Sequence, residues 1–272
     1  MNNVHLFLPK DSLPPLSFLP AGKSVEWLDH TEDSKENYVK RGGHAVYGEH
    51  DITYSFNSLG YRSVEFDTRA DLRVVAIGCS YVMGVGLPQQ DLFHEVFAEQ
   101  LRRKTGKTVA VLNLGAPGGS NDYIARLLHL AVPRLDPEIV LINFTHVGRR
   151  EYVSVQSQLL TYVPGYRSSN PVIRDIYKHL ASLTSPLDDD LNLFRNFKSV
   201  EALLGGRAWF FSSISATDFE RLGEHITRER YVGAMPQLDK ARDGCHPGPE
   251  SHRMLANRYW ESFIANGDVV PR

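Results

Sequence analysis

From residue 73 onward, the chain alternates between short apolar runs and longer segments with apolar residues at helical spacing. Four continuous apolar runs have the length of buried strands, at residues 74–77, 109–114, 139–142 and 208–211. Four further segments are amphipathic, at residues 91–103, 121–135, 191–204 and 249–264. This alternation predicts an α/β fold in which helices cover both faces of a parallel sheet. In such a sheet a functional site lies at the carboxyl ends of the strands.

Residues 1–72 have a different character, because they are rich in proline, charge and aromatic side chains and show no long helical period. Ile52, Tyr54 and Phe56 alternate with polar residues, which predicts one half-buried strand. We therefore expect an irregular, partly β N-terminal extension that packs on a core domain of residues 73–272.

A stretch at about residues 152–187 follows the third predicted strand and holds several prolines together with Tyr162, Tyr166 and Tyr177. Its position predicts a cap insertion that shapes a pocket at the strand ends. The tyrosines suit stacking on a sugar ring, but packing against other side chains is the more common use of aromatic residues.

Composition narrows the class of protein. The 272 residues carry 30 Lys and Arg against 32 Asp and Glu, and this balance argues against a nucleic-acid-binding surface. The chain lacks the basic start of a signal peptide and any apolar stretch of membrane-spanning length. We expect a soluble, cytoplasmic protein that binds neither nucleic acid nor membrane.

The 11 histidines show no metal-ligand spacing, so no cofactor is expected.

Three of the loops expected at the strand ends hold residues that suit catalysis or the binding of a negatively charged group. The first strand runs into Ser80, whose hydroxyl is held out of the sheet by a glycine-flanked strand-to-helix turn. The second strand is followed by a glycine-rich loop, residues 115–119, that opens a helix. Near the C-terminus Asp243 stands three residues before His246, a spacing that lets a carboxylate orient an imidazole.

Together these pieces resemble the motif blocks of the SGNH (GDSL) hydrolase superfamily, in the same order and over about residues 73–265. The matching blocks are Gly78-Cys79-Ser80, Asn113-x-Gly115-x-x-Gly118 and Asp243-x-x-His246. Cysteine stands where the first block usually has aspartate. Each block alone is a weak signal, whereas three blocks that follow predicted strands are fairly specific.

The resemblance implies a flavodoxin-like, three-layer α/β/α fold and a serine hydrolase. It implies Ser80 as the nucleophile, His246 as general base and then acid, and Asp243 as the partner that orients His246. The N–H groups of Ser80 and Gly115 are the implied oxyanion donors. The implied partner is a small-molecule acyl ester, such as an acetylated sugar, and no cofactor or metal is implied.

The third block departs from the family pattern. Its asparagine, whose side chain is a third oxyanion donor, falls at Val147 when the blocks are aligned on the third strand. A valine side chain donates no hydrogen bond, and one lost donor typically costs roughly 10²–10³ in rate. Asn121, Thr145 and His146 are the candidates to replace it, with Asn121 and Thr145 favoured equally. His146 and Arg149 are also candidate substrate-binding residues.

Simpler interpretations of these residues stay open. Ser80 also suits a helix cap, Cys79 is a rival nucleophile, and the glycine loop resembles a phosphate cradle. Arg149, Arg150 and Glu151 fit a solvated rim, and His252 fits a position on a helix surface.

The two cysteines precede the two central residues of the implied site. Cys79 comes directly before Ser80, and Cys245 comes directly before His246. They are interpreted either as small side chains behind the site or as a pair that bonds across it.

The predicted function is hydrolysis of a small acyl ester through an acyl-enzyme, with a carbohydrate O-deacetylase as the most specific form. An O-acyltransferase of the same fold has the same triad and differs in whether the closed site excludes water. A non-catalytic binding protein is the third hypothesis, motivated by the missing asparagine of the third block.

Overall fold

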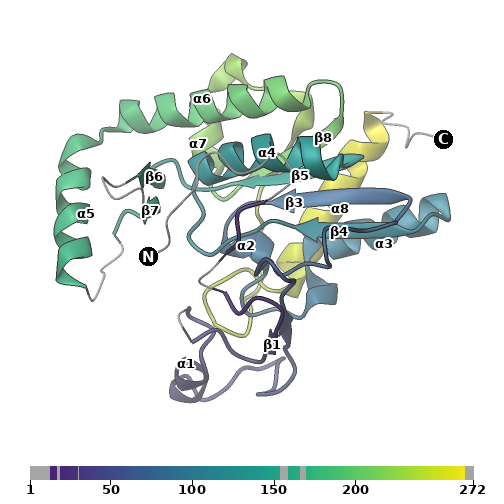
Figure 1. The fold of residues 1–272 in the computed structure, drawn as a ribbon, viewed down its shortest axis with the longest axis horizontal. Coiled ribbons are helices and arrows are strands. Elements are labelled where there is room, and N and C mark those ends of the chain that lie inside the picture. Colours follow the sequence, from purple (N-terminus) through teal and green to yellow (C-terminus); the bar gives the residue numbers. More distant parts are fainter. Residues whose placement is uncertain (1–12, 17–18, 30, 154–158, 166–169, 267–272) are drawn as a thin grey trace.

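A five-stranded parallel sheet forms the centre of the molecule in the computed structural model (Figure 1). The structure describes residues 13–16, 19–29, 31–153, 159–165 and 170–266. The strands lie in the order β4-β3-β5-β8-β9, and their bounds in that order are Val109–Asn113, Leu72–Ile77, Ile139–Phe144, Ala208–Ser213 and Tyr231–Ala234. All neighbouring pairs are parallel. Numbered along the chain, this order is 2-1-3-4-5, which is the flavodoxin-like arrangement.

Four long helices cover the two faces of the sheet. α3 and α8 pack on one face and α4 and α6 on the other, with the bounds Phe93–Thr105, Pro249–Ala265, Asn121–Leu135 and Pro186–Leu204. Side chains alternate along a strand, so Val74 joins the α3–α8 core whereas Val75 joins the α4–α6 core. Strands buried on both faces appear as continuous apolar runs. The predicted three-layer α/β/α fold is therefore confirmed.

The remaining elements are short or lie outside these layers. They are β1 (Ser24–Val25), α1 (Lys35–Lys40), β2 (Tyr54–Ser55), α2 (Ser80–Met83), η1 (Gln89–Asp91), β6 (Arg150–Val153), β7 (Leu159–Tyr162), α5 (Pro171–Leu183), α7 (Ala216–Glu220), η2 (Gly223–His225) and η3 (Arg228–Arg230). β1 pairs with β2, and β6 pairs with β7, both antiparallel. Among the described helices, none combines the length and the apolar character that a membrane crossing requires.

Two differences from the predicted elements have local causes. α6 begins at Pro186 instead of residue 191, because Ser185 caps it by accepting the N–H of Asp188 at 3.2 Å. β9 was not predicted, since all of its residues are only half-buried and Gly233 interrupts its short apolar run. Neither feature produces a strong periodic signal.

The predicted cap segment, residues 152–187, contains the end of β6, β7 and α5. Tyr162 and Tyr177 pack edge to face, with ring centroids 5.2 Å apart, so both are packing aromatics. Tyr166, the third tyrosine of the segment, lies outside the described residues. α5 stands away from the sheet layers in Figure 1 and buries none of its residues among the described ones.

Three partly buried ion pairs attach the β6–β7 hairpin to the helices. Arg150 Nη2 lies 2.8 Å from Asp188 Oδ2 and 2.9 Å from Asp189 Oδ1. Arg126 binds Glu151 through two hydrogen bonds of 2.8 Å. The side chains of Arg150 and Glu151 are only 6% and 7% exposed, so their interpretation as a solvated rim is wrong. Charges buried to this degree are almost always paired, as these are.

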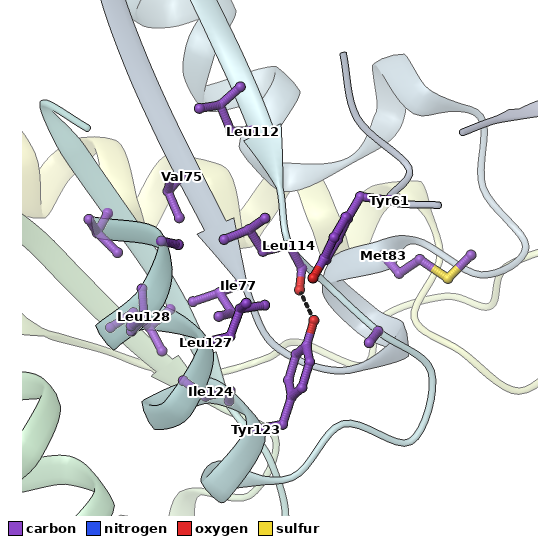
Figure 2. Packing of buried hydrophobic residues seen from close by; sticks show 14 of the residues in the cluster. Tyr61, Val75, Ile77, Met83, Leu112, Leu114, Tyr123, Ile124, Leu127 and Leu128 are labelled. Carbon is purple, nitrogen blue, oxygen red and sulfur yellow. Dashed lines mark hydrogen bonds between the residues drawn. The ribbon is translucent and has the colours of Figure 1, made fainter. Parts of the chain in front are cut away.

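The N-terminal extension shares the apolar core on the α4 side of the sheet. Its contributing side chains include Leu16, Ile52, Tyr54, Phe56 and Tyr61. Figure 2 shows Tyr61 beside Leu114, at the end of β4, and on the same side as Met83 of α2. The strand expected around residues 52–56 is reduced to the two-residue β2.

Two buried histidines lie on α3 and α8, which pack against each other. His94 Nε2 is 3.1 Å from the carbonyl of Val82, and His252 Nδ1 accepts the N–H of Phe93 at 3.1 Å. Burial lowers the pKa of His94 to about 4 and that of His252 to about 3, and the charge of Arg62 adds to both shifts. The interpretation of His252 as a helix-surface residue is wrong, because this residue is 1% exposed.

We expect the free energy of unfolding to fall when the pH drops from 7 to 5. An unfolded histidine takes up a proton near pH 6.5, whereas His94 and His252 stay neutral in the fold, so protonation stabilises the unfolded chain. The loss is on the order of 2 kcal/mol for each histidine, and urea denaturation at both pH values measures it.

His252→Gln provides the control, because glutamine keeps an acceptor for the Phe93 N–H but does not titrate. Its pH dependence should be smaller than that of the wild type by the contribution of one histidine. An equal pH dependence in both proteins would contradict the assignment.

Candidate active site

Ser80 lies at the start of a short helix that follows β3, the first strand of the sheet along the chain. β3 ends at Ile77, and α2 begins at Ser80 with Cys79 as its extended N-cap residue. A Cβ at Gly78 would lie 2.7 Å from the backbone oxygen of Asn143 in β5, so only glycine lets this turn pass the neighbouring strand. The Ser80 hydroxyl is thereby held at the carboxyl edge of the sheet.

Asp243 and His246 come from the loop before α8 and reach the same edge. His246 Nε2 lies 2.8 Å from Ser80 Oγ, and His246 Nδ1 is hydrogen-bonded to Asp243 Oδ2. Asp243 Oδ1 accepts the N–H groups of Cys245 and His246, both at 2.9 Å. The structure thus brings the three residues of the implied triad together as one hydrogen-bonded chain.

The electrostatics of this hydrogen-bonded triad favour a charged Asp243 carboxylate next to His246. Burial raises the pKa of the Asp243 carboxyl, but the hydrogen bonds and charge of His246 and the two backbone N–H groups outweigh it and hold that pKa below its ordinary value. The carboxylate accepts the Nδ1 proton, which leaves Nε2 as the acceptor for the Ser80 hydroxyl. Tyr81 packs edge-on against His246, with ring centroids 5.4 Å apart, and restrains the imidazole.

The glycine loop after β4 is fixed by Asn113. The Asn113 side chain accepts the N–H of Gly115 at 2.9 Å and donates to the carbonyl of Val82 at 3.1 Å. A Cβ at Gly115 would lie 2.3 Å from the backbone nitrogen of Met83, so the loop touches α2 directly. The Gly115 N–H already has an acceptor, which corrects its implied role as an oxyanion donor. Gly115 instead packs the loop against the helix that carries Ser80.

The N–H groups of Ser80 and Gly118 make no hydrogen bond within the described part of the chain. Ser80 is the first residue of α2, so no helical carbonyl lies one turn before it. Gly118 has φ +73°, a left-handed conformation that favours glycine. A Cβ at Gly118 would lie 3.9 Å from Cγ2 of Val163, so the cap segment reaches this loop. The sequence matched Gly118 to its block, but its free N–H became evident only from the structure.

The loop after β5 places Thr145 next to Asn121. Asn121 Nδ2 donates to the Thr145 carbonyl at 3.1 Å, and Asn121 Oδ1 accepts the Thr145 N–H at 2.9 Å. This pairing orients the Asn121 amide toward the backbone of the loop and uses one of its two N–H donors, so its role as an oxyanion donor stays a prediction. Arg149 Nη1 donates to Thr145 Oγ1 at 2.9 Å, which leaves the hydroxyl proton of Thr145 available.

His146 and Arg149, the two predicted substrate-binding residues, share this loop. The Arg149 N–H donates to the carbonyl of His146 at 3.1 Å. Partial desolvation, followed by the charge of Arg149, lowers the pKa of His146, although the residue is exposed. The Arg149 guanidinium has no carboxylate partner among the described residues. Val147, at the position of the missing asparagine, packs against the apolar core.

Both cysteines are free thiols, so the structure contains no bond between Cys79 and Cys245. Cys79 is fully buried and Cys245 is exposed. Ser80, and not Cys79, is the side chain in hydrogen-bond contact with His246, which disfavours Cys79 as the nucleophile. Within the described residues, no group of three or more His, Cys, Asp or Glu side chains is arranged to hold a metal ion.

No protein-family model matches this sequence, and the comparison with curated proteins gives no match. Among solved structures, the chain is similar to TesA at 14% identity and a TM-score of 0.48, over 71% of this chain and 98% of that one. It is similar to the psychrotrophic esterase EstA from Pseudoalteromonas sp. at 12% identity and a TM-score of 0.46, over 73% and 100%. It is also similar to a Clostridium thermocellum family 3 carbohydrate esterase at 11% identity and a TM-score of 0.46, over 72% and 96%.

Gly115→Ala should lower the free energy of unfolding by about 1–3 kcal/mol, because its Cβ would overlap the α2 backbone at Met83. Gly206→Ala is the matched control, since a Cβ there meets nothing within 4 Å and its φ is not left-handed. Urea denaturation of both variants measures the difference. Equal stability of the two would show that the glycine loop does not press on α2.

Proposed function

We propose that this chain is a serine esterase of the SGNH type, which hydrolyses small acyl esters through an acyl-enzyme. One observation carries the proposal: Ser80 Oγ lies 2.8 Å from His246 Nε2, and Asp243 holds the other nitrogen of His246. A serine is a weak nucleophile unless a base removes its proton, and this arrangement provides both the base and its orienting carboxylate. The flavodoxin-like strand order and the position of the three sequence blocks after strands support the same family.

The reaction begins when His246 takes the Ser80 proton as Oγ attacks the carbonyl carbon of the ester. Asp243 stabilises the imidazolium that forms, because its buried carboxylate lies against Nδ1. The tetrahedral intermediate collapses, and the alcohol leaves with the proton from His246. Water, deprotonated by the same imidazole, then attacks the acyl-enzyme and releases the acid.

The oxygen that becomes negative in the intermediate needs donors that are fixed in advance. The N–H groups of Ser80 and Gly118 suit this role, because they follow the neighbouring strands β3 and β4 and have no hydrogen bond in the described residues. We assign the third donor to the Thr145 hydroxyl, after β5. Arg149 donates to its oxygen, and because hydrogen bonds in a chain polarise one another, this contact makes the hydroxyl a stronger donor.

Within the class of acyl esters, we propose O-acetyl groups on carbohydrates as the substrate. The support is the motif resemblance, since the substrates of that superfamily include acetylated sugars. A panel of p-nitrophenyl acetate, butyrate and octanoate, together with an acetylated xylose, tests the preference for acetyl esters. The same assay with added free sugar identifies an O-acyltransferase, because an acceptor alcohol would then consume the acyl-enzyme faster than water does.

Ser80→Ala and His246→Ala should each reduce kcat for p-nitrophenyl acetate at least roughly 10⁴-fold, because Ser80→Ala removes the nucleophile of the triad and His246→Ala removes its base. A fluorophosphonate probe should label the wild-type protein at Ser80 and leave both variants unlabelled there.

Ser199 provides an internal control for this labelling. Its Oγ lies 2.7 Å from His129 Nε2 near the surface, but no described carboxylate stands behind that imidazole. Ser199 should therefore not react with the probe. Labelling of Ser199 at the rate of Ser80, or wild-type hydrolysis no faster than that of Ser80→Ala, would refute the esterase proposal.

Thr145→Val should lower kcat roughly 10²–10³-fold with little change in KM, since valine keeps the volume but removes a donor that acts in the transition state. Thr145→Ser keeps a hydroxyl and should retain most of the activity. Steady-state kinetics with p-nitrophenyl acetate measure both. Wild-type kcat in Thr145→Val would show the third donor to be another group, while the triad assignment stands.

A further inference from the structure

A buried ionic cluster joins the N-terminal extension to the loop that carries Asp243. Its centre is the ion pair of Asp33 and Arg242, whose side chains are both 0% exposed. Arg242 Nε lies 3.0 Å from Asp33 Oδ1, and Arg242 Nη2 lies 2.7 Å from Asp33 Oδ2. Such a bidentate contact fixes the orientation of the guanidinium relative to the carboxylate as well as their distance. Arg242 directly precedes Asp243 in the chain.

The rest of the Arg242 guanidinium is also bound by the extension. Nη1 donates to the Glu49 carbonyl at 3.2 Å, and Nη2 donates to the Glu26 carbonyl at 2.6 Å. The guanidinium carbon lies 3.8 Å from the ring centroid of Trp27. In Figure 1 the yellow-green chain that leads into α8 lies beside the purple extension, which agrees with these contacts. Each nitrogen of this guanidinium is therefore bound by residues 26–49.

The same cluster reaches the loop that follows the nucleophile helix. The Tyr54 hydroxyl is hydrogen-bonded to Asp33 and accepts the N–H of Gly86 at 2.7 Å. Arg62 stacks on the Tyr54 ring, 4.4 Å from its centroid, and donates to the carbonyl of Gly84 at 2.6 Å. Two residues of the extension thus hold the C-terminal end of α2 and the turn after it.

The two catalytic loops meet each other at this point. The Arg242 N–H donates to the Gly86 carbonyl at 2.9 Å. A Cβ at Gly86 would lie 2.9 Å from Cβ of Ala241 and 3.0 Å from the backbone nitrogen of Asp243. Any shift of one loop therefore changes its contact with the other, and Asp33 and Tyr54 hold that contact from the extension side.

We propose that the N-terminal extension is a positioning element of the active site, in which Asp33 and Tyr54 fix the loop of Ser80 against the loop of His246. The inference rests on the proposed esterase function. Neither positioning residue touches the reacting atoms, so both act through Gly86 and Arg242. A misplacement of about 1 Å between reacting groups costs roughly 10²-fold in rate, which makes loop position a direct determinant of kcat.

Tyr54→Phe tests the proposal, because it removes only the hydroxyl between Asp33 and Gly86 and keeps the ring under Arg62. We expect kcat for p-nitrophenyl acetate to fall roughly 10-fold or more with KM unchanged. Rates are divided by the concentration of active sites, titrated with a fluorophosphonate, so that unfolded protein does not count. Asp33→Asn, which leaves Arg242 without a counter-charge, should lose more activity than Tyr54→Phe.

Tyr38→Phe is the matched control. It removes a tyrosine hydroxyl of the same extension, which donates to the Tyr47 carbonyl at 3.2 Å outside the cluster. This variant should keep the wild-type kcat. Wild-type kcat per active site in Tyr54→Phe would overturn the proposal, whatever the melting temperature of that variant.

Amide hydrogen exchange tests the extension independently of catalysis. Residues 84–87 and 241–246 should exchange faster in Tyr54→Phe than in Tyr38→Phe, because local opening of both loops becomes easier. Equal exchange in the two variants would overturn the proposal. Failure of the wild-type protein to react with the fluorophosphonate would overturn the esterase function instead, and the exchange data would still show whether the extension holds these loops.

Discussion

The hydrogen bond between Ser80 and His246 is the contact on which the rest of the site depends. It joins residues 166 positions apart, and in the proposed mechanism neither side chain acts without the other. The parallel sheet makes the contact feasible, because β3 ends just before Ser80 and β9 precedes the loop of Asp243 at the same edge. An imidazole must also point in one direction. Asp243 sets that direction from a buried position, and Tyr81 restrains the ring from its side.

The helix that carries Ser80 cannot hold this geometry by itself. α2 has four residues, whereas isolated helices shorter than about 12 residues are marginal in water. Its carbonyl groups are fixed from outside: that of Val82 accepts from both Asn113 and His94, and that of Met83 accepts from Arg62. Asn113 therefore contributes to the site without contacting the reacting atoms. The position of the Ser80 hydroxyl therefore depends on three other segments of the chain, which contain Arg62, His94 and Asn113.

The sheet, its four covering helices and the Asp243–His246 pair could be predicted because their signals are local in sequence, whereas the pairing of His246 with Ser80 was implied only by the motif resemblance. A strand buried on both faces is a continuous apolar run, and Asp243 stands only three residues from His246. The contacts that hold the site could not be predicted, since they join distant segments. Asp33 and Arg242 are 209 positions apart, and no spacing rule connects them. The motif likewise suggested a donor role for Gly115, whereas its close approach to α2 exists only in three dimensions.

The two buried arginines explain how loops without regular structure pass beneath an active site. A buried loop leaves carbonyl groups that no helix or strand ladder satisfies, and each one costs free energy unless it finds a donor. Arg62 donates to the carbonyl groups of Gly84 and Leu87, and Arg242 to those of two segments of the extension. An apolar core would fill the same space, and replacing a buried ion pair by apolar side chains is often neutral for stability. An apolar core would leave these carbonyl groups without donors, however. The two arginines therefore supply hydrogen bonds to the loop carbonyl groups and orient the loops.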